Sequence, residues 1–168
     1  MPTATDPLII VNATPLISLD ACNQIELLRS FYARVVVPDA VEKELRRGGR
    51  TALPSGITPA HRAWIDVLPL STPPSAALLA ALDRGEAEVI ALALELGCPR
   101  VVLDEQEARS VAIAMGLQVV GTMGILLRAK KSGEIPAVKP CVDDMVTKGI
   151  WLKQKLIDFV LRQAGELV

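Results

Sequence analysis

Short apolar runs alternate with longer stretches of helical periodicity along most of the chain. The apolar runs predict strands at residues 8–12, 34–37, 100–104 and 118–120, and an alternating stretch at 64–70 predicts an edge strand. The longer stretches predict helices after Thr14, over residues 24–31, 39–47, 75–82, 85–96, 105–115 and 124–131, and twice more around Gly149 between 138 and 165. Such alternation favours parallel strands joined by right-handed crossovers, with helices on both faces. We therefore predict an α/β fold, a three-layer α/β/α sandwich with a short central parallel sheet.

Polar residues and prolines indicate where several of these elements begin and end. Thr14 and Pro15 suit an N-cap and a first helical residue, while Asp39 and Glu42 have the spacing of a capping box. Residues 48–59 contain several glycines and prolines and no clear periodicity. We therefore expect a loop or small excursion at about 48–63, within a single domain that spans 1–168.

The composition excludes several classes of protein. The chain has 168 residues, 51% of them apolar and 22% charged, which suits one globular domain and excludes a disordered tail. Its net charge of −1 provides no overall field that would attract nucleic acid or a membrane. No apolar run approaches the roughly 18–20 residues of a membrane span, and the N-terminus lacks the features of a signal peptide. We expect a cytoplasmic protein that does not contact a membrane.

Counts of rare residues narrow the possible chemistry. The one histidine, His61, and three scattered cysteines offer no cluster of zinc ligands. Nucleophilic catalysis by a Ser–His or Cys–His pair would have to use His61, which lies in a loop-like stretch. Cysteines without a CxxC pair fit small buried residues in a reducing compartment. Any catalysis is therefore left to carboxylates.

Two polar residues follow predicted strands at the edge where ligands gather in open α/β sheets. Asn12 closes the run LIIVN, and Asp104 closes the run RVVLD. Each has a structural alternative. Asn12 fits an Asx turn into the next helix, and Asp104 fits a capping box with Glu107. The residues themselves leave both interpretations open.

A glutamate on the helix predicted over 39–47 is a further candidate. Glu44 stands roughly 60° from Val41 around the helix axis, so its carboxylate should border the buried face, whereas Glu42 should point outward. A half-buried acid needs a cation or hydrogen-bond donors as partners. The structural alternative for Glu44 is a salt bridge to a nearby arginine.

Glu86 opens the apolar helix predicted over 85–96. A first-turn acid is favoured by the helix dipole, which is its structural alternative. Glu88 points about 200° away around the helix and cannot easily share a small site with it. Of the two acids, Glu86 is the candidate.

A turn and a basic run carry weaker signals. Residues 121–124 join a strand to a helix and could expose backbone amides to a phosphate, but their sequence GTMG has neither Rossmann nor P-loop spacing. The densest positive charge comes from Lys43, Arg46, Arg47 and Arg50. This run fits either a solvated face or contact with a phosphate backbone. With 3% aromatic residues, a base-stacking platform is not expected.

In their order and spacing, four segments of the chain resemble the PIN-domain superfamily. Over nearly its whole length, the chain is similar to a PIN-like family of unknown function found in bacteria and archaea. The four segments are VNATPLISL, VPDAVEKEL, LDRGEAEVIALALELG and VVLDEQEARSVAIAMGLQVVGTMGILLRAK. They extend from about Leu8 to Lys131, and the end of the chain, with its terminal helix and AGE, also fits.

The resemblance implies an acidic pocket that binds Mg²⁺ or Mn²⁺. Carried over by motif, the catalytic and metal-binding positions fall on Asn12, Glu44, Glu86 and Asp104. PIN domains are typically metal-dependent ribonucleases, and many are toxins neutralised by a small antitoxin protein. The partners that the resemblance implies are therefore RNA, an antitoxin and a second copy of the chain in a homodimer.

Two of these positions depart from the family's pattern. Asn12 stands where active nucleases have an aspartate, and Glu86 is one methylene longer than the usual aspartate. One unit charge at ~4 Å is worth up to about 4 kcal/mol at an effective dielectric near 20, so cation binding is expected to be weak or absent. The leading hypothesis is a metal-dependent ribonuclease of the toxin type. The alternatives are a catalytically impaired module that binds protein or RNA and a nucleotide-binding regulator built on residues 121–124.

Overall fold

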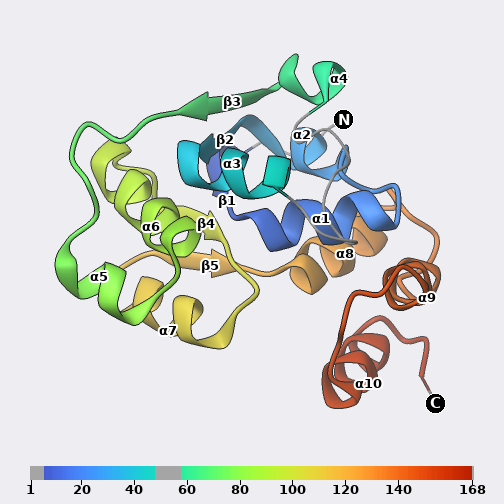
Figure 1. The fold of residues 1–168 in the computed structure, drawn as a ribbon. Helices are drawn as coiled ribbons and strands as arrows, with labels where there is room; N and C mark the ends of the chain where they lie inside the picture. The colour runs from blue at the N-terminus through green and yellow to red at the C-terminus, as the bar shows by residue number, and fades with distance from the viewer. Residues whose placement is uncertain (1–5, 48–57, 168) are drawn as a thin grey trace.

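A five-stranded parallel sheet forms the centre of the protein (Figure 1). The structure is a computed structural model that describes residues 6–47 and 58–167. The strands lie in the order β3-β2-β1-β4-β5, and every neighbouring pair is parallel. Their bounds are β1 (Asp6–Val11), β2 (Tyr32–Pro38), β3 (Ile65–Leu68), β4 (Arg100–Val102) and β5 (Gln118–Val120). The predicted strands are thus present, and the run at 64–70 supplies an edge strand.

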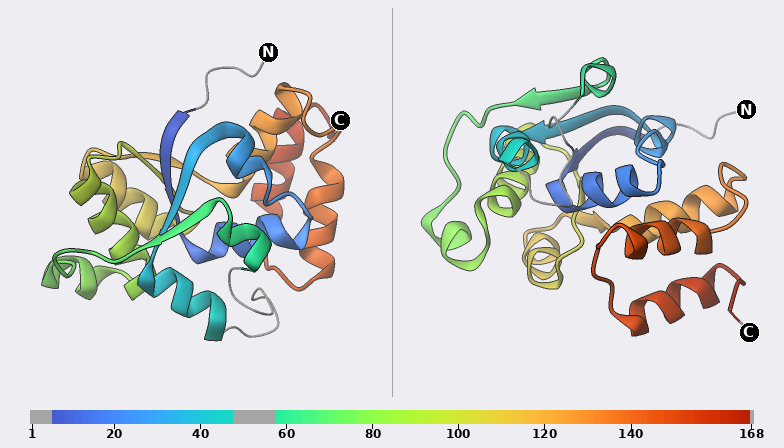
Figure 2. Two further views of the ribbon diagram at one scale, coloured as in Figure 1. Left: turned by 90° about the horizontal axis from the view of Figure 1, so that it is seen from above. Right: turned by 45° about the vertical axis from the view of Figure 1, so that its right-hand side comes forward.

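Helices connect these strands and follow the last one. Their bounds are α1 (Ala13–Ala21), α2 (Leu27–Phe31), α3 (Asp39–Arg47), α4 (Pro59–Arg62), α5 (Ala76–Ala81), α6 (Arg84–Leu96), α7 (Gln106–Ala114), α8 (Thr122–Lys131), α9 (Lys139–Thr147) and α10 (Gln154–Gln163). α6 packs against β1, β2 and β4 at the middle of the sheet and also against α3. The helices flank the sheet on both sides, which confirms the predicted three-layer α/β/α fold (Figure 2).

The two central strands are buried on both faces, which explains their continuous apolar runs. Ile9, Ile10 and Val11 of β1 are fully buried, and the three valines of β2 are at most 1% exposed. The last two helices pack away from the sheet, α9 against α1 and α10 against α8 (Figure 1). No helix in residues 6–47 and 58–167 is both long and apolar enough to cross a membrane.

Several helix starts differ from the predictions. α1 begins at Ala13 with Asn12 in the N-cap position, two residues earlier than the Thr14 cap predicts, and α2 covers only the end of the 24–31 stretch. The capping box predicted for α3 is also wrong. The Glu42 carboxylate accepts from the side chains of Arg46 and Arg62, and not from the backbone at Asp39. A charged donor binds a carboxylate more strongly than a neutral amide does.

The excursion predicted at about 48–63 is only partly within the described residues, because 48–57 lie outside them. The described end of this segment holds the short helix α4, which Thr58 caps by accepting a hydrogen bond from the His61 amide at 3.2 Å. His61 packs edge-on against Trp64. The three cysteines are buried and free, as the scattered spacing predicts.

The end of the chain is fastened by one carboxylate. Glu166 accepts from the amides of Val138 (2.7 Å) and Lys139 (2.8 Å) at the start of α9, and from Lys130 Nζ of α8 (2.9 Å). Burial alone would raise the pKa of Glu166, but these donors hold the pKa below its ordinary value. The ionised carboxylate therefore joins α8, α9 and the C-terminal segment.

We predict that Glu166→Gln lowers the free energy of unfolding by about 1–3 kcal/mol at neutral pH, because the charge and one acceptor are lost. A lowered pKa in the folded state gives stabilisation that is present above the ordinary glutamate pKa of about 4.3 and is lost as the pH falls below it. Urea denaturation at neutral and acidic pH checks this. The difference from wild type should shrink in acid, and a difference independent of pH would contradict this role, as would an equal loss in the exposed control Glu134→Gln.

Candidate functional site

Asn12 directly follows β1, and its side-chain oxygen is a buried hydrogen-bond acceptor without a partner. The backbone amide of Asn12 donates to the Val102 carbonyl of β4 at 3.1 Å, and this bond fixes the turn between β1 and α1. The residue is only 4% exposed and occupies the N-cap position of α1, yet its side chain makes no capping bond. The side-chain oxygen Oδ1 has no hydrogen-bond partner. A buried acceptor without a partner costs about 1–3 kcal/mol, so an Asx turn does not account for Asn12, and its oxygen is available to a ligand.

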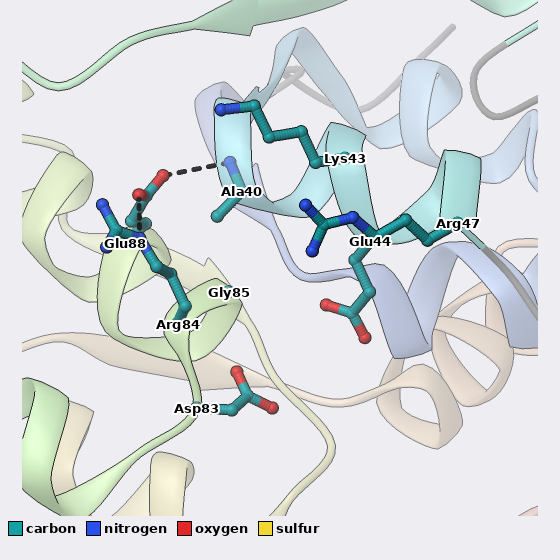
Figure 3. A pocket seen from close by; sticks show the side chains of 8 residues that line it. All are labelled: Ala40, Lys43, Glu44, Arg47, Asp83, Arg84, Gly85 and Glu88. Carbon is teal, nitrogen blue, oxygen red and sulfur yellow. Dashed lines mark hydrogen bonds and ion pairs between the residues drawn. The ribbon is translucent and has the colours of Figure 1, made fainter.

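Three side-chain oxygens converge where Gly85 has no side chain. A Cβ at this position would lie 2.9 Å from Oε2 of Glu44, 3.3 Å from Oδ1 of Asn12 and 3.5 Å from Oδ1 of Asp83. These oxygens come from three elements: the end of β1, α3 and the N-cap of α6. Figure 3 shows the Glu44 carboxylate directed from α3 toward Asp83 and Gly85. Glycine in the first turn of α6 therefore leaves room for an oxygen-lined cradle.

The Glu44 carboxylate carries its charge without a compensating base. It makes no ion pair with a described residue, so the predicted alternative of a salt bridge is wrong for Arg46 and Arg47. Burial, followed by the charge of Asp83, raises its pKa. The buried acid of α3 is instead Glu42, which is 8% exposed and was expected to point outward. Glu42 can be buried because Arg46 and Arg62 neutralise it and fasten α3 to α4.

Asp83 and Glu86 form a capping box that starts α6. The Glu86 amide donates to Oδ1 of Asp83 at 2.8 Å, and the Asp83 amide donates to Oε2 of Glu86 at 3.2 Å. Glu86 is 6% exposed, and burial raises its pKa, as do the nearby charges of Asp83, Glu105 and Glu44. Glu86 thus combines its predicted structural role with a place beside Glu44. The analysis of the sequence missed Asp83, although the spacing Asp-x-x-Glu before an apolar run is the signal of such a box.

Glu88 faces a different direction and joins the two helices that build the cradle. Its Oε2 accepts from the Ala40 amide at the start of α3 (3.1 Å), and its Oε1 accepts from Arg84 Nε (3.0 Å). Glu88 is 6% exposed, so these bonds are largely shielded from water. They hold the first turn of α3 against α6 and keep Glu44 opposite Asp83.

Asp104 is engaged with the start of α8. Its two carboxylate oxygens accept from the Thr122 amide (2.7 Å) and the Thr122 hydroxyl (2.6 Å). Burial raises its pKa, while these bonds and the charge of Arg109 act in the opposite direction. The predicted capping box with Glu107 is wrong, because the N-cap of α7 is Glu105 and makes no side-chain capping bond. Since Asp104 also occupies the Thr122 amide, that amide is not open to a phosphate at residues 121–124.

Of the four positions predicted from the resemblance, the structure brings Asn12 and Glu44 to one point and places Glu86 within electrostatic reach of Glu44. The interactions of Asp104 run to Thr122 and Arg109. Its neighbour Glu105 acts on the charge of Glu86. The inclusion of Asp104 in the site stays a prediction.

The chemistry of the converging donors fits a hard divalent cation. No three His, Cys, Asp or Glu side chains gather closely enough to hold a metal ion in the part of the chain that the structure describes. The cradle instead combines one amide oxygen, from Asn12, with the carboxylates of Glu44 and Asp83. Oxygen donors are those preferred by Mg²⁺ and similar ions. A cation there would satisfy the unpaired oxygen of Asn12 and offset the repulsion between the two acids.

A comparison with known families identifies the chain. A family model described as a PIN domain matches residues 8–166, so the chain belongs to the PIN-domain family. This membership gives the fold of a nuclease class whose members generally use divalent metals. No curated protein and no solved structure matches the chain.

We predict that Asp83→Asn makes the protein more stable at neutral pH when no divalent cation is present, by about 0.3–1 kcal/mol. Asparagine caps a helix as well as aspartate does, so the cap of α6 is kept while the repulsion of Glu44 and Glu86 is relieved. Because the folded-state pKa values of these two acids are raised, their ionised forms destabilise the protein above those values, and protonation removes the cost as the pH falls.

Urea denaturation in EDTA, at neutral pH and near pH 5, measures this difference. The gain from Asp83→Asn should be largest at neutral pH and should shrink in acid. Glu134→Gln removes one negative charge between α8 and α9 and serves as the control for net charge. A variant that is less stable than wild type at neutral pH would show that the Asp83 charge does not oppose its neighbours.

Proposed function

We propose that this protein is a metal-dependent ribonuclease that hydrolyses phosphodiester bonds at the site formed by Asn12, Glu44, Asp83 and Glu86, with Asp104 at its border. The observation that carries the proposal is the buried, unpaired Oδ1 of Asn12 beside carboxylate oxygens of Glu44 and Asp83. Membership of the PIN-domain family supports the reaction class. The acidic character of the site supports the need for a cation, since these carboxylates by themselves repel the negative charge of a phosphodiester.

Asn12, Glu44 and Asp83 are the residues that would hold Mg²⁺ or Mn²⁺. When bound, such an ion supplies Lewis acidity and a water of lowered pKa for attack at phosphorus. Asn12 is held in place by the backbone bond to β4, and Glu44 and Asp83 by the packing of α3 on α6. The capping bond to the Asp83 amide keeps Glu86 behind the cradle, where its charge strengthens the attraction for a cation. These residues therefore preorganise the donors before a ligand arrives.

The amide at Asn12 favours a second candidate function. An aspartate at this position would add a unit charge worth up to about 4 kcal/mol at ~4 Å, which corresponds to as much as a thousandfold in cation affinity at ~1.4 kcal/mol for each factor of ten. A chain that lacks this charge could keep the fold and lose the reaction. The second candidate is therefore a catalytically impaired PIN-like module that binds protein or RNA.

A biological role follows from the resemblance to PIN-domain toxins. We propose that the ribonuclease is the toxin component of a toxin–antitoxin pair, acts in the cytoplasm as a homodimer and is neutralised by a small antitoxin protein. The support for this role is the family resemblance over residues 8–166.

The test is cleavage of a fluorescently labelled RNA by the full chain with Mn²⁺ or Mg²⁺, together with Mn²⁺ titration calorimetry. Wild type should cleave and should stop in EDTA. Glu44→Gln should reduce cleavage by at least about a hundredfold, as expected when one preorganised charge is removed from a catalytic site. Asn12→Asp should tighten Mn²⁺ binding and speed cleavage. Glu134→Gln, an exposed acid between α8 and α9, should behave as wild type.

Three outcomes separate the candidates. If Asn12→Asp cleaves RNA in a metal-dependent manner and wild type does not, the protein is the impaired module. Cleavage by wild type that persists in EDTA would rule out the metal-dependent reaction. If neither wild type nor Asn12→Asp binds Mn²⁺ or cleaves, the proposed site is wrong.

A further inference from the structure

A cavity of about 450 Å³ opens between α3 and α6, directly beside the oxygen cradle (Figure 3). Glu44, Asp83 and Gly85 contribute to its lining, so the cavity and the cradle share one wall. Its remaining charged lining includes the bases Lys43, Arg47 and Arg84. A volume of this size lies within the range of small-molecule sites, about 300–1,000 Å³. It can therefore admit a segment of a substrate next to the acids.

The structure divides the basic run of α3 into two groups. Arg46 turns to Glu42, with Nε at 2.6 Å from the carboxylate, and contributes nothing to the cavity. Lys43 and Arg47 are four residues apart on the helix, lie on one face, and both line the cavity. Figure 3 shows their side chains extending from α3 toward α6. Arg50, the last member of the run, lies outside the described residues.

Lys43 and Arg47 carry charge that no described acid neutralises. Neither makes an ion pair with a described residue, although Glu44 lies on the same helix. The pKa of Glu44 is raised by burial and by Asp83, which agrees with the absence of a close cation. Arg84 differs from these two, because its guanidinium is bound to Glu88. The cavity thus places two available cations beside an acidic cradle.

We propose that Lys43 and Arg47 bind a backbone phosphate of the RNA that neighbours the phosphate at the cradle. This inference rests on the proposed function, which brings RNA to the site. A guanidinium binds two phosphate oxygens at once, and an ammonium acts as a point charge for the same group. The described residues that line the cavity include no aromatic side chain on which a base could stack. Binding here is therefore to the backbone and tolerates different sequences.

The arrangement also explains how a polyanion can approach an acidic site. The carboxylates of Glu44 and Asp83 repel phosphates, and a cation at the cradle offsets that repulsion only locally. Two bases on the adjoining wall attract the next phosphate and hold the strand across the cavity. An acidic protein segment offers a different kind of anion to the same pair, so the experiment includes it as a competing outcome.

The test is the affinity of the full chain for a short single-stranded RNA with a fluorescent label, measured by anisotropy in EDTA and again with Mn²⁺, over a series of salt concentrations. The double variant Lys43→Ala/Arg47→Ala should bind at least about tenfold more weakly, since hydrogen bonds to charged groups are among the stronger ones. The slope of log affinity against log salt should fall by about 0.7, the change expected when one phosphate contact to a single strand is lost.

The control is Lys131→Ala/Lys155→Ala, which removes the same net charge from exposed residues outside the cavity and should change the affinity by less than about twofold. Thermal unfolding of each variant establishes that it folds. The inference is overturned if the Lys43/Arg47 double variant binds like wild type or like this control. It is also overturned if wild type fails to bind RNA both in EDTA and with Mn²⁺. If poly-glutamate then binds through Lys43 and Arg47, the ligand of these two residues is an acidic protein segment and not RNA.

Cleavage measured in parallel keeps the two proposals apart. If wild type cleaves RNA and the double variant keeps full affinity, the phosphate subsite is wrong and the ribonuclease stands. If RNA binding depends on Lys43 and Arg47 but no metal-dependent cleavage occurs, the subsite stands and the ribonuclease is wrong.

Discussion

The close approach of α3 to α6 at Gly85 is the contact on which the proposed site depends. A Cβ at this position would lie 2.9 Å from Oε2 of Glu44 and 3.3 Å from Oδ1 of Asn12, so glycine at residue 85 leaves the room that these oxygens occupy. The approach is held from the other side by Glu88, which binds the Ala40 amide. A core of fully buried strands behind the cradle fixes the turn that presents Asn12. The geometry of the site is therefore set by packing, while its chemistry is set by which polar atoms remain unpaired.

Unbalanced charge distinguishes this region from the rest of the protein. Acids elsewhere that are buried or partly buried have partners: Glu42 binds two arginines, Glu88 binds Arg84, and Glu166 binds Lys130 and two amides. Glu44 and Asp83 make no ion pair with a described residue, and the pKa values of Glu44 and Glu86 are raised. Natural proteins tolerate such local conflicts mainly at functional sites. A cation at the cradle would neutralise the acids there, and a phosphate bound to Lys43 and Arg47 would neutralise the bases of the adjoining cavity.

The fold follows from the sequence more directly than the site does. Apolar runs predicted the central strands, because strands buried on both faces must be apolar throughout, while an alternating stretch predicted the edge strand β3. Helix starts were less predictable, since tertiary contacts decide which groups bind the carboxylates of Glu42 and Asp104. Asp104 caps α8, which follows the neighbouring strand, and not the helix next to it in the sequence. Local spacing cannot reveal such a partner.

The candidate site was predicted only in part, because tertiary contacts also decide which of its side chains have partners. Helical spacing predicted a half-buried Glu44, which is exposed, and it reversed the burial of Glu42, because arginines from two helices could not be foreseen as partners. Asp83 was missed as a donor, although its capping spacing is visible in the sequence. The family resemblance correctly pointed to the fold. It could not indicate that the oxygens of Asn12, Glu44 and Asp83 share the space beside Gly85.

Anomalous X-ray diffraction from crystals of the wild-type chain soaked in Mn²⁺ tests the central claim most directly, because it locates the ion without relying on activity. The account predicts an anomalous peak within coordination distance of Oδ1 of Asn12 and of the Glu44 and Asp83 carboxylates, at about 2.0–2.3 Å as for oxygen ligands of hard divalent ions. A peak elsewhere, or an empty cradle at saturating Mn²⁺ with the Asn12 oxygen bonded to a protein group, would contradict it.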